Sequence, residues 1–120
     1  MQAENKPSLT EVLIQDYDIS KGDKVISKEI NGSWTYSIHI IGKDMTDTLD
    51  STVSLFGTND DKLDEKYWYD LSKSVTLNSA DCGKVMDGYY LSPKYIILKI
   101  KQNTCTGGLV TIISTLSRAL

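Results

Sequence analysis

Short runs of β-prone residues, separated by glycine, asparagine and aspartate, extend along the chain and restrict the fold that it can adopt. Within these runs apolar and polar side chains alternate, as they do along a strand with one buried face. The nearest approach to an amphipathic helix, residues 62–73, holds an aromatic cluster that favours a loop or a single turn. The pattern predicts an all-β, single-domain antiparallel β-sandwich of jelly-roll type. The expected strands cover residues 10–15, 23–30, 33–41, 51–57, 74–77, 88–91, 94–101 and 109–116.

The strongest local turn signal is Asn31-Gly32, which lies between two of these runs. Both residues tolerate the positive φ angles of a two-residue type I′ turn, so we expect 23–30 and 33–41 to pair as a hairpin. In that register Ile26 and Ile30 fall on the more polar face, so either that face is partly covered or a bulge shifts the phase. The face of 33–41 that is expected in the core consists of Trp34, Tyr36, Ile38 and Ile40.

The length of the chain, 120 residues, allows one hydrophobic core but not two. We expect an N-terminal arm at 1–9, the sandwich domain at 10–117 and a short tail at 118–120. The run 109–116 is apolar on both faces, which is typical of an interior strand. The residues expected in the core are Trp34, Ile38, Leu55, Leu98 and Ile112.

The charge of the chain argues against two classes of partner. Its formal net charge is −3 and its isoelectric point is about 5.0, so phosphate backbones and anionic membranes do not attract it in general. Arg118 is the only arginine, although base readout favours the planar arginine fork. No apolar run approaches the roughly 20 residues that cross a bilayer, and the first residues lack a signal-peptide pattern. We expect a protein made in the cytoplasm that binds neither nucleic acid nor membrane.

Candidate catalytic groups are few. His39 is the only histidine, and it alternates with Ile38 and Ile40, which places it on a solvated or interface face. The nucleophile elbow Gly-x-Ser-x-Gly and the phosphate-binding glycine loops are absent from the sequence. We therefore expect no enzymatic activity and no bound cofactor.

Two acidic loops hold the oxygen ligands that calcium prefers. Neither loop follows the Asp-x-Asp-x-Asp-Gly pattern, so we expect solubilising turn residues, with calcium binding as the less favoured alternative. The first loop holds Asp44, Asp47 and Asp50, and the second holds Asn59, Asp60, Asp61 and Asp64.

The chain has two cysteines, Cys82 and Cys105, which is the minimum for one disulfide. In the absence of an export signal we expect free thiols, with a disulfide as the alternative. Two cysteines so far apart, with one histidine in the chain, do not make a structural zinc site.

Aromatic residues are the most promising candidates for contact with a partner or ligand. Aromatic side chains near loops stack on sugar rings or anchor protein interfaces. For Trp68 an equally good interpretation is that it plugs one end of the sandwich. The candidates are Tyr67, Trp68, Tyr69, Tyr89 and Tyr90.

Three segments together resemble a known family. A strand runs into Gly57-Thr58-Asn59-Asp60, the segment 67–71 reads Tyr-Trp-Tyr-Asp-Leu, and 94–100 reads Lys-Tyr-Ile-Ile-Leu-Lys-Ile. This order resembles the galactose-binding-like (discoidin-type) β-sandwich. Lys94 stands where that family often has arginine, Ile97 replaces a second arginine, and the sugar-binding loops of its lectin members have no match.

The same pattern on a short chain is similar to small virion accessory proteins of tailed bacteriophages. The resemblance implies a capsid decoration, head-fibre or tail-associated protein that binds other virion proteins. It also implies a homo-oligomer located in the virion after synthesis in the host cytoplasm, with a host glycan as a further partner. The alternative function is a small carbohydrate-binding module of galactose-binding-like fold.

Overall fold

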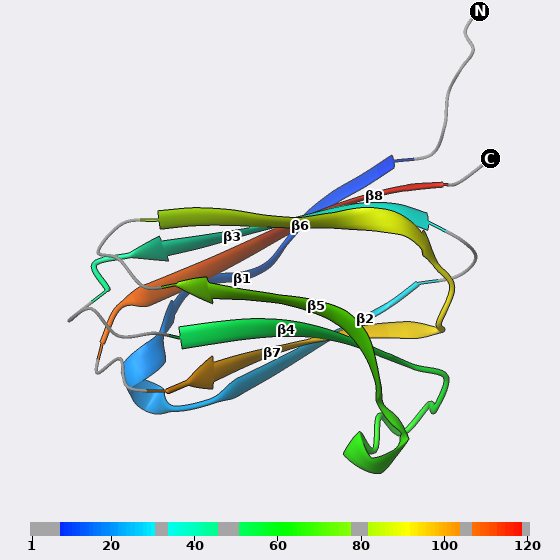
Figure 1. Cartoon of the computed structure of the whole chain (residues 1–120), viewed down its shortest axis with the longest axis horizontal. Helices are drawn as coiled ribbons and strands as arrows, with labels where there is room; N and C mark the ends of the chain where they lie inside the picture. Colours follow the sequence, from blue (N-terminus) through cyan, green and yellow to red (C-terminus); the bar gives the residue numbers. More distant parts are fainter. Residues whose placement is uncertain (1–7, 31–33, 46–50, 78–81, 104–106, 119–120) are drawn as a thin grey trace, which may run out of the picture.

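The computed structural model describes residues 8–30, 34–45, 51–77, 82–103 and 107–118, and these form two packed antiparallel sheets (Figure 1). Sheet A has the strand order β1-β8-β3-β6, and sheet B has the order β2-β7-β4-β5. Of the described residues, only two 3-10 turns, η1 and η2, are helical, and neither is long or apolar enough to cross a membrane. The bounds are β1 Ser8–Asp18, η1 Ile19–Lys21, β2 Lys24–Glu29, β3 Trp34–Lys43, β4 Ser51–Thr58, η2 Glu65–Tyr67, β5 Tyr69–Leu77, β6 Cys82–Leu91, β7 Tyr95–Gln102 and β8 Leu109–Arg118.

The topology is that of one long hairpin folded over on itself. The strands pair from the tip outward, β4 with β5, β3 with β6, β2 with β7 and β1 with β8, and successive pairs alternate between the sheets. Two four-stranded antiparallel sheets connected in this way form a jelly roll. The predicted all-β sandwich of jelly-roll type is therefore confirmed.

The predicted hairpin at Asn31-Gly32 is wrong. β2 lies in sheet B, where it pairs with β7 from Lys24 opposite Ile100 to Glu29 opposite Tyr95. β3 lies in the other sheet, between β8 and β6. Residues 31–33, which connect the two strands, fall outside the described part of the chain.

The placement of β2 and β3 in separate sheets also explains why Ile26 and Ile30 fall on the polar face of the predicted hairpin. From sheet B, Ile30 points into the same core as the apolar face of β3 and is 3% exposed. Ile26 packs against that core as well. No bulge in β2 is needed, because its register with β7 runs without a shift.

The core lies between the sheets and contains every residue predicted for it from strand alternation. Trp34, Ile38, Leu55, Leu98 and Ile112 are all buried. Burying one such side chain fully stabilises the fold by about 1.5 to 3 kcal/mol. β8 lies between β1 and β3, so its expected interior position is confirmed.

Candidate functional site

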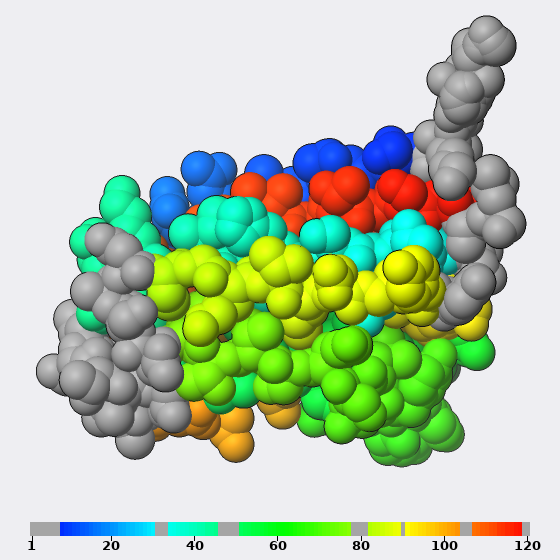
Figure 2. Space-filling view, turned by 45° about the horizontal axis from the view of Figure 1, so that its top comes forward, coloured from blue at the N-terminus to red at the C-terminus, as the bar shows by residue number. Residues whose placement is uncertain are grey.

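Within the described part of the chain, no loop or helix lies over the outer face of sheet A, and this face has few charges. We call its outward-pointing residues the sheet A face; on β3 and β8 they alternate with buried residues, and those on β1 and β6 lie beside them in the register. Figure 2 shows the strands as adjacent bands, coloured blue, red, teal and yellow in the order β1, β8, β3, β6. The face consists of Ser8, Thr10 and Val12 on β1, Thr111, Ile113, Thr115 and Ser117 on β8, Thr35, Ser37, His39 and Ile41 on β3, and Gly83, Val85, Asp87 and Tyr89 on β6.

Charge is scarce on this surface compared with the rest of the chain. Charged residues make up 24% of the sequence, whereas Asp87 is the only one among the sheet A face residues just named. Asp16 and Lys43 stand at one border of the face, beside Thr111 and Ile41. Apolar groups remain in contact with solvent here, since Val85 is 55% exposed.

A hollow of about 320 Å³ lies in the sheet A face where β3, β6 and β8 meet. A β-carbon at Gly88 would come within 2.7 Å of the Tyr36 hydroxyl oxygen, so glycine at this position makes room for the tyrosine. Burial, followed by the nearby Asp87 carboxylate, raises the pKa of Tyr36. The lining residues are Thr35, Tyr36, Ser37, Asp87, Gly88, Tyr89, Thr115 and Ser117.

His39 lies exposed in the sheet A face, as its alternation with Ile38 and Ile40 predicts. Its cross-strand neighbours are Val85 on β6 and Ile113 on β8, which carry no acid, base or nucleophile. Cys82 packs against the core, and together with His39 it lines a hollow of about 550 Å³ at the β3–β6 edge. Neither of these two cross-strand neighbours could act with His39 as an acid, base or nucleophile.

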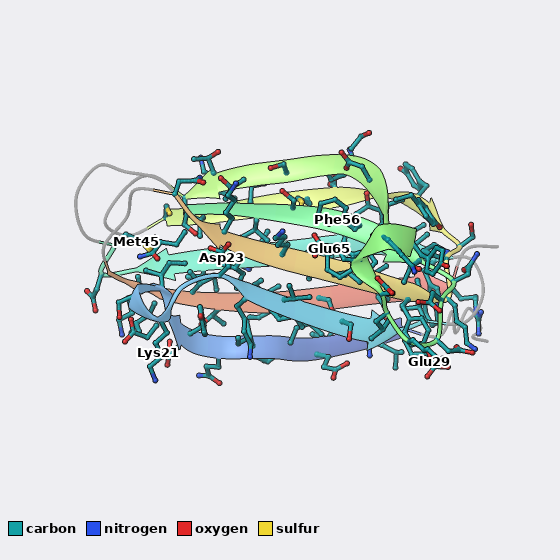
Figure 3. The ribbon with its side chains drawn as sticks, turned by 90° about the horizontal axis from the view of Figure 1, so that it is seen from below. Lys21, Asp23, Glu29, Met45, Phe56 and Glu65 are labelled. Carbon is teal, nitrogen blue, oxygen red and sulfur yellow. The ribbon has the colours of Figure 1, made fainter. Side chains whose placement is uncertain are left out.

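The outer face of sheet B is partly covered by the β4–β5 connection, residues 59–68. Figure 3 shows η2 lying over this face, close to Phe56 and Glu65. The Trp68 and Phe56 ring centroids are 5.7 Å apart, and Trp68 Nε1 donates to the Leu63 carbonyl oxygen at 3.1 Å. Ile97, which is the cross-strand neighbour of Phe56, is fully buried although it points away from the main core.

Polar contacts fix this connection to β7. The Tyr95 hydroxyl donates to Asp61 Oδ1 at 3.0 Å, and Lys94 forms an ion pair with the same carboxylate. The hydrogen bond from Lys94, then that from Tyr95, lowers the pKa of Asp61. The same contacts raise the pKa values of Lys94 and Tyr95. A second ion pair joins Lys99 to Glu65 at 3.4 Å.

In the second acidic loop, one carboxylate oxygen each of Asp60 and Asp64 accepts a hydrogen bond within a turn. Asp60 Oδ2 accepts from the Asp64 backbone nitrogen at 2.9 Å, and Asp64 Oδ1 accepts from the Lys66 nitrogen at 3.2 Å. In the first loop Asp44 has a φ of 53°, while Asp47 and Asp50 lie outside the described residues. Across the described ranges, no three His, Cys, Asp or Glu side chains gather in a way that could hold a metal ion.

The structure divides the five candidate aromatic residues between the two sheets. Tyr67, Trp68 and Tyr69 lie where the connection enters β5, whereas Tyr89 projects from the sheet A face and is 75% exposed. Trp68 packs against the Phe56 ring on the outer face of sheet B. The side chain of Tyr90 is outside the described part of the structure.

A shallow groove of about 520 Å³ opens beside Tyr67 and Tyr69. Tyr67 is 59% exposed and Tyr69 is 44% exposed. The remaining lining residues are Thr58, Asn59 and Asp60 from the end of β4 and the turn after it. The groove therefore combines two aromatic rings with hydroxyl, amide and carboxylate groups.

Of the two predicted thiols, Cys82 is a free cysteine in the structure. Cys105 lies outside the described residues, so the expectation for it stays a prediction.

Sequence reasoning did not single out the sheet A face as a site. A signal for this face was present in the segment 33–41. Its alternating polar residues are Thr35, Ser37 and His39, and none of them is lysine or glutamate. The outward residues of β8 are likewise threonine, isoleucine and serine. Interface cores are depleted of charged residues, so an outward strand face without charges is the pattern that could have pointed to this surface.

No protein-family model and no curated protein matches the chain. Among solved structures, the chain is similar to the CBM36-1 domain of a multidomain xylanase from the hindgut metagenome of Trinervitermes trinervoides (7% identity, TM-score 0.56, covering 95% of this chain and 99% of that chain). It is also similar to the K3 cleaved adhesin domain of Lys-gingipain from Porphyromonas gingivalis w83 (8% identity, TM-score 0.55, 92% and 72%). At these identities both likenesses show a shared β-sandwich fold and nothing further.

Proposed function

We propose that the chain is a non-catalytic interaction protein of a bacteriophage particle, and that it docks onto other virion proteins through the sheet A face. The observation that carries the proposal is the scarcity of charge on that face, where Asp87 is the only charged residue of the set named above. Interface cores are depleted of charged residues and enriched in aromatic ones, and Tyr89 supplies an exposed ring here.

The polar groups of this face are inexpensive to bury because several are already hydrogen-bonded within the sheet. The hydroxyls of Thr10 and Thr115 lie 3.1 Å apart, and Thr35 Oγ1 donates to the Ser117 carbonyl oxygen at 3.3 Å. A buried hydroxyl costs free energy chiefly when it loses its hydrogen bonds. Covering the face with a partner therefore removes apolar surface from water at little polar cost.

The virion as the place of docking is supported by the resemblance of 54–60, 67–71 and 94–100 to phage accessory proteins. A particle repeats the same binding site many times, so an oligomer of the chain gains effective concentration from neighbouring sites and needs only modest affinity at each. Jelly rolls recur in capsid and lectin domains, which agrees with a binding role. Two similar structures, a CBM36-1 domain of a xylanase and an adhesin domain, are named as modules of larger proteins, which supports a role without catalysis.

The test is a binding assay with intact particles of the phage that encodes the chain and, separately, with its unassembled coat protein. We expect the chain to co-sediment with particles and to bind the free coat protein weakly. Val85→Lys places a charge in the sheet A face and should weaken particle binding about tenfold or more. The matched control is Val25→Lys, because Val25 is a 45% exposed valine on β2 of sheet B.

Equal binding by the two lysine variants contradicts the assignment to sheet A. Mass spectrometry of purified particles gives an independent answer, since particles that never contain the chain rule out the virion role.

A further inference from the structure

The groove beside Tyr67 and Tyr69 lies where the chain passes from η2 into β5. Trp68, between the two tyrosines, has an extended backbone with φ −76° and ψ 145°. Trp68 packs on Phe56, whereas Tyr67 and Tyr69 line the groove. A β-carbon at Gly57 would come within 3.2 Å of Tyr69 Cζ, so glycine lets the Tyr69 ring settle against β4.

The floor of the groove is held by hydrogen bonds that leave other polar atoms available. Thr58 Oγ1 donates to the Tyr67 carbonyl oxygen and accepts from the Asp60 nitrogen, each at 3.1 Å. Asn59 Oδ1 accepts from the Lys94 nitrogen at 2.7 Å, which leaves its amide group as a donor. Asp60 uses Oδ2 to accept from Asp64, which leaves Oδ1 as an acceptor.

We propose that this groove binds a neutral saccharide, with Tyr67 and Tyr69 stacking on sugar rings and Asn59 and Asp60 hydrogen-bonding to sugar hydroxyls. A sugar ring has an apolar C–H face that suits an aromatic ring, and its hydroxyls both donate and accept hydrogen bonds. The amide donor of Asn59 and the carboxylate acceptor of Asp60 match that pair of properties. Because the groove is open and shallow, it suits units along an oligosaccharide chain.

The site is built before any ligand arrives. Trp68 holds the connection on Phe56 of β4. The Asp61–Lys94 ion pair and the hydrogen bond from the Tyr95 hydroxyl hold it at the start of β7. A groove that is already ordered loses little conformational entropy on binding, so a few modest contacts suffice for measurable affinity. The groove shares no residue with the sheet A face, so saccharide binding is a function separate from particle docking.

Isothermal titration calorimetry with xylohexaose, cellohexaose, mannohexaose and N-acetyllactosamine tests the proposal. We expect at least one of these probes to bind the wild-type chain. Tyr67→Ala and Tyr69→Ala should each weaken that binding about tenfold or more, because each removes a stacking ring. Tyr67→Phe and Tyr69→Phe keep the aromatic ring, so these variants should lose much less affinity for the saccharide.

Val25→Ala, on β2, is the control and should leave affinity unchanged, and thermal unfolding of every variant shows that it is folded. The proposal is overturned if none of the four probes binds at millimolar concentration, or if binding survives both alanine substitutions. Loss of particle docking in Val85→Lys with saccharide binding intact separates the two functions, so the failure of one leaves the other standing.

Discussion

The two outer faces of the sandwich come from strands of similar length, yet only one of them is covered. On sheet B the 59–68 connection folds back, and Ile97 beneath it is fully buried. On sheet A the corresponding outward isoleucine, Ile113, is only half-buried. Both isoleucines alternate with buried residues of their own strands, so the difference comes from the loop and not from the strand pattern. On sheet B the outward isoleucine belongs to a second small core under the 59–68 connection. On sheet A the outward isoleucine remains part of the protein surface.

The sharpest test of this contrast compares Ile97→Ala with Ile113→Ala. Deleting the methyl groups of a fully buried isoleucine leaves a cavity, so Ile97→Ala should lower the free energy of unfolding by about 2 to 5 kcal/mol. Ile113→Ala removes less buried surface and leaves no enclosed cavity, so it should cost less, about 1 to 2 kcal/mol. Urea denaturation of both variants measures the difference. Equal losses would show that the 59–68 connection does not cover sheet B in solution.

A matched pair of threonines extends the comparison to polar groups. Thr58, at the end of β4, is fully buried and makes two hydrogen bonds, so Thr58→Val should cost about 1 to 3 kcal/mol. Thr35, in the sheet A face, makes one bond of 3.3 Å and is partly exposed, so Thr35→Val should change stability by about 0.5 kcal/mol or less. Thermal unfolding of the two variants provides the measurement, and a larger loss for Thr35 would contradict the assignment.

The smallest expected effect concerns pH and the attachment of the connection to β7. The pKa of Asp61 is lowered in the folded state, mainly by the hydrogen bond from Lys94, so its contribution is present above the unfolded pKa of about 3.9. That contribution is lost as the pH falls through the folded pKa. Asp61→Asn should therefore show a weaker loss of stability in acid than the wild type does. Unfolding midpoints measured from about pH 6 to about pH 2 provide the test, and identical pH profiles would count against this ion pair.

The sequence predicted the core well because alternation is a local property of a strand. Leu98 and Ile112 belong to runs whose apolar residues can face only one way if the strand is half-buried. The prediction of a hairpin at Asn31-Gly32 was wrong because the pairing partner of a strand is not a local property of the sequence. The turn residues specify a tight reversal equally well whether the chain returns in the same sheet or crosses to the other. Ile26 and Ile30 on the polar face of the assumed hairpin were the sign of the crossing.

The candidate site was predicted only in part, for a related reason. Tyr67 and Tyr69 stood out by composition, and the structure places them together in one groove. Tyr89 was grouped with them but lies on the other sheet. The burial of Ile97 could not be foreseen, because it depends on where the 59–68 connection comes to rest, and no periodic pattern encodes that position.

The pairing of the first strand with the last has a consequence for biosynthesis. Thr10 on β1 and Thr115 on β8 are separated by 105 positions in the sequence. At a synthesis rate of about 5 to 20 residues per second, β1 waits on the order of ten seconds before its partner leaves the ribosome. During that interval β3 also lacks β8, and the apolar side chains of the unfinished sheet face solvent. Non-local β pairing of this kind folds in about milliseconds to seconds once the chain is complete. The nascent chain is therefore a candidate client for chaperones until Leu109 and the strand that follows have emerged.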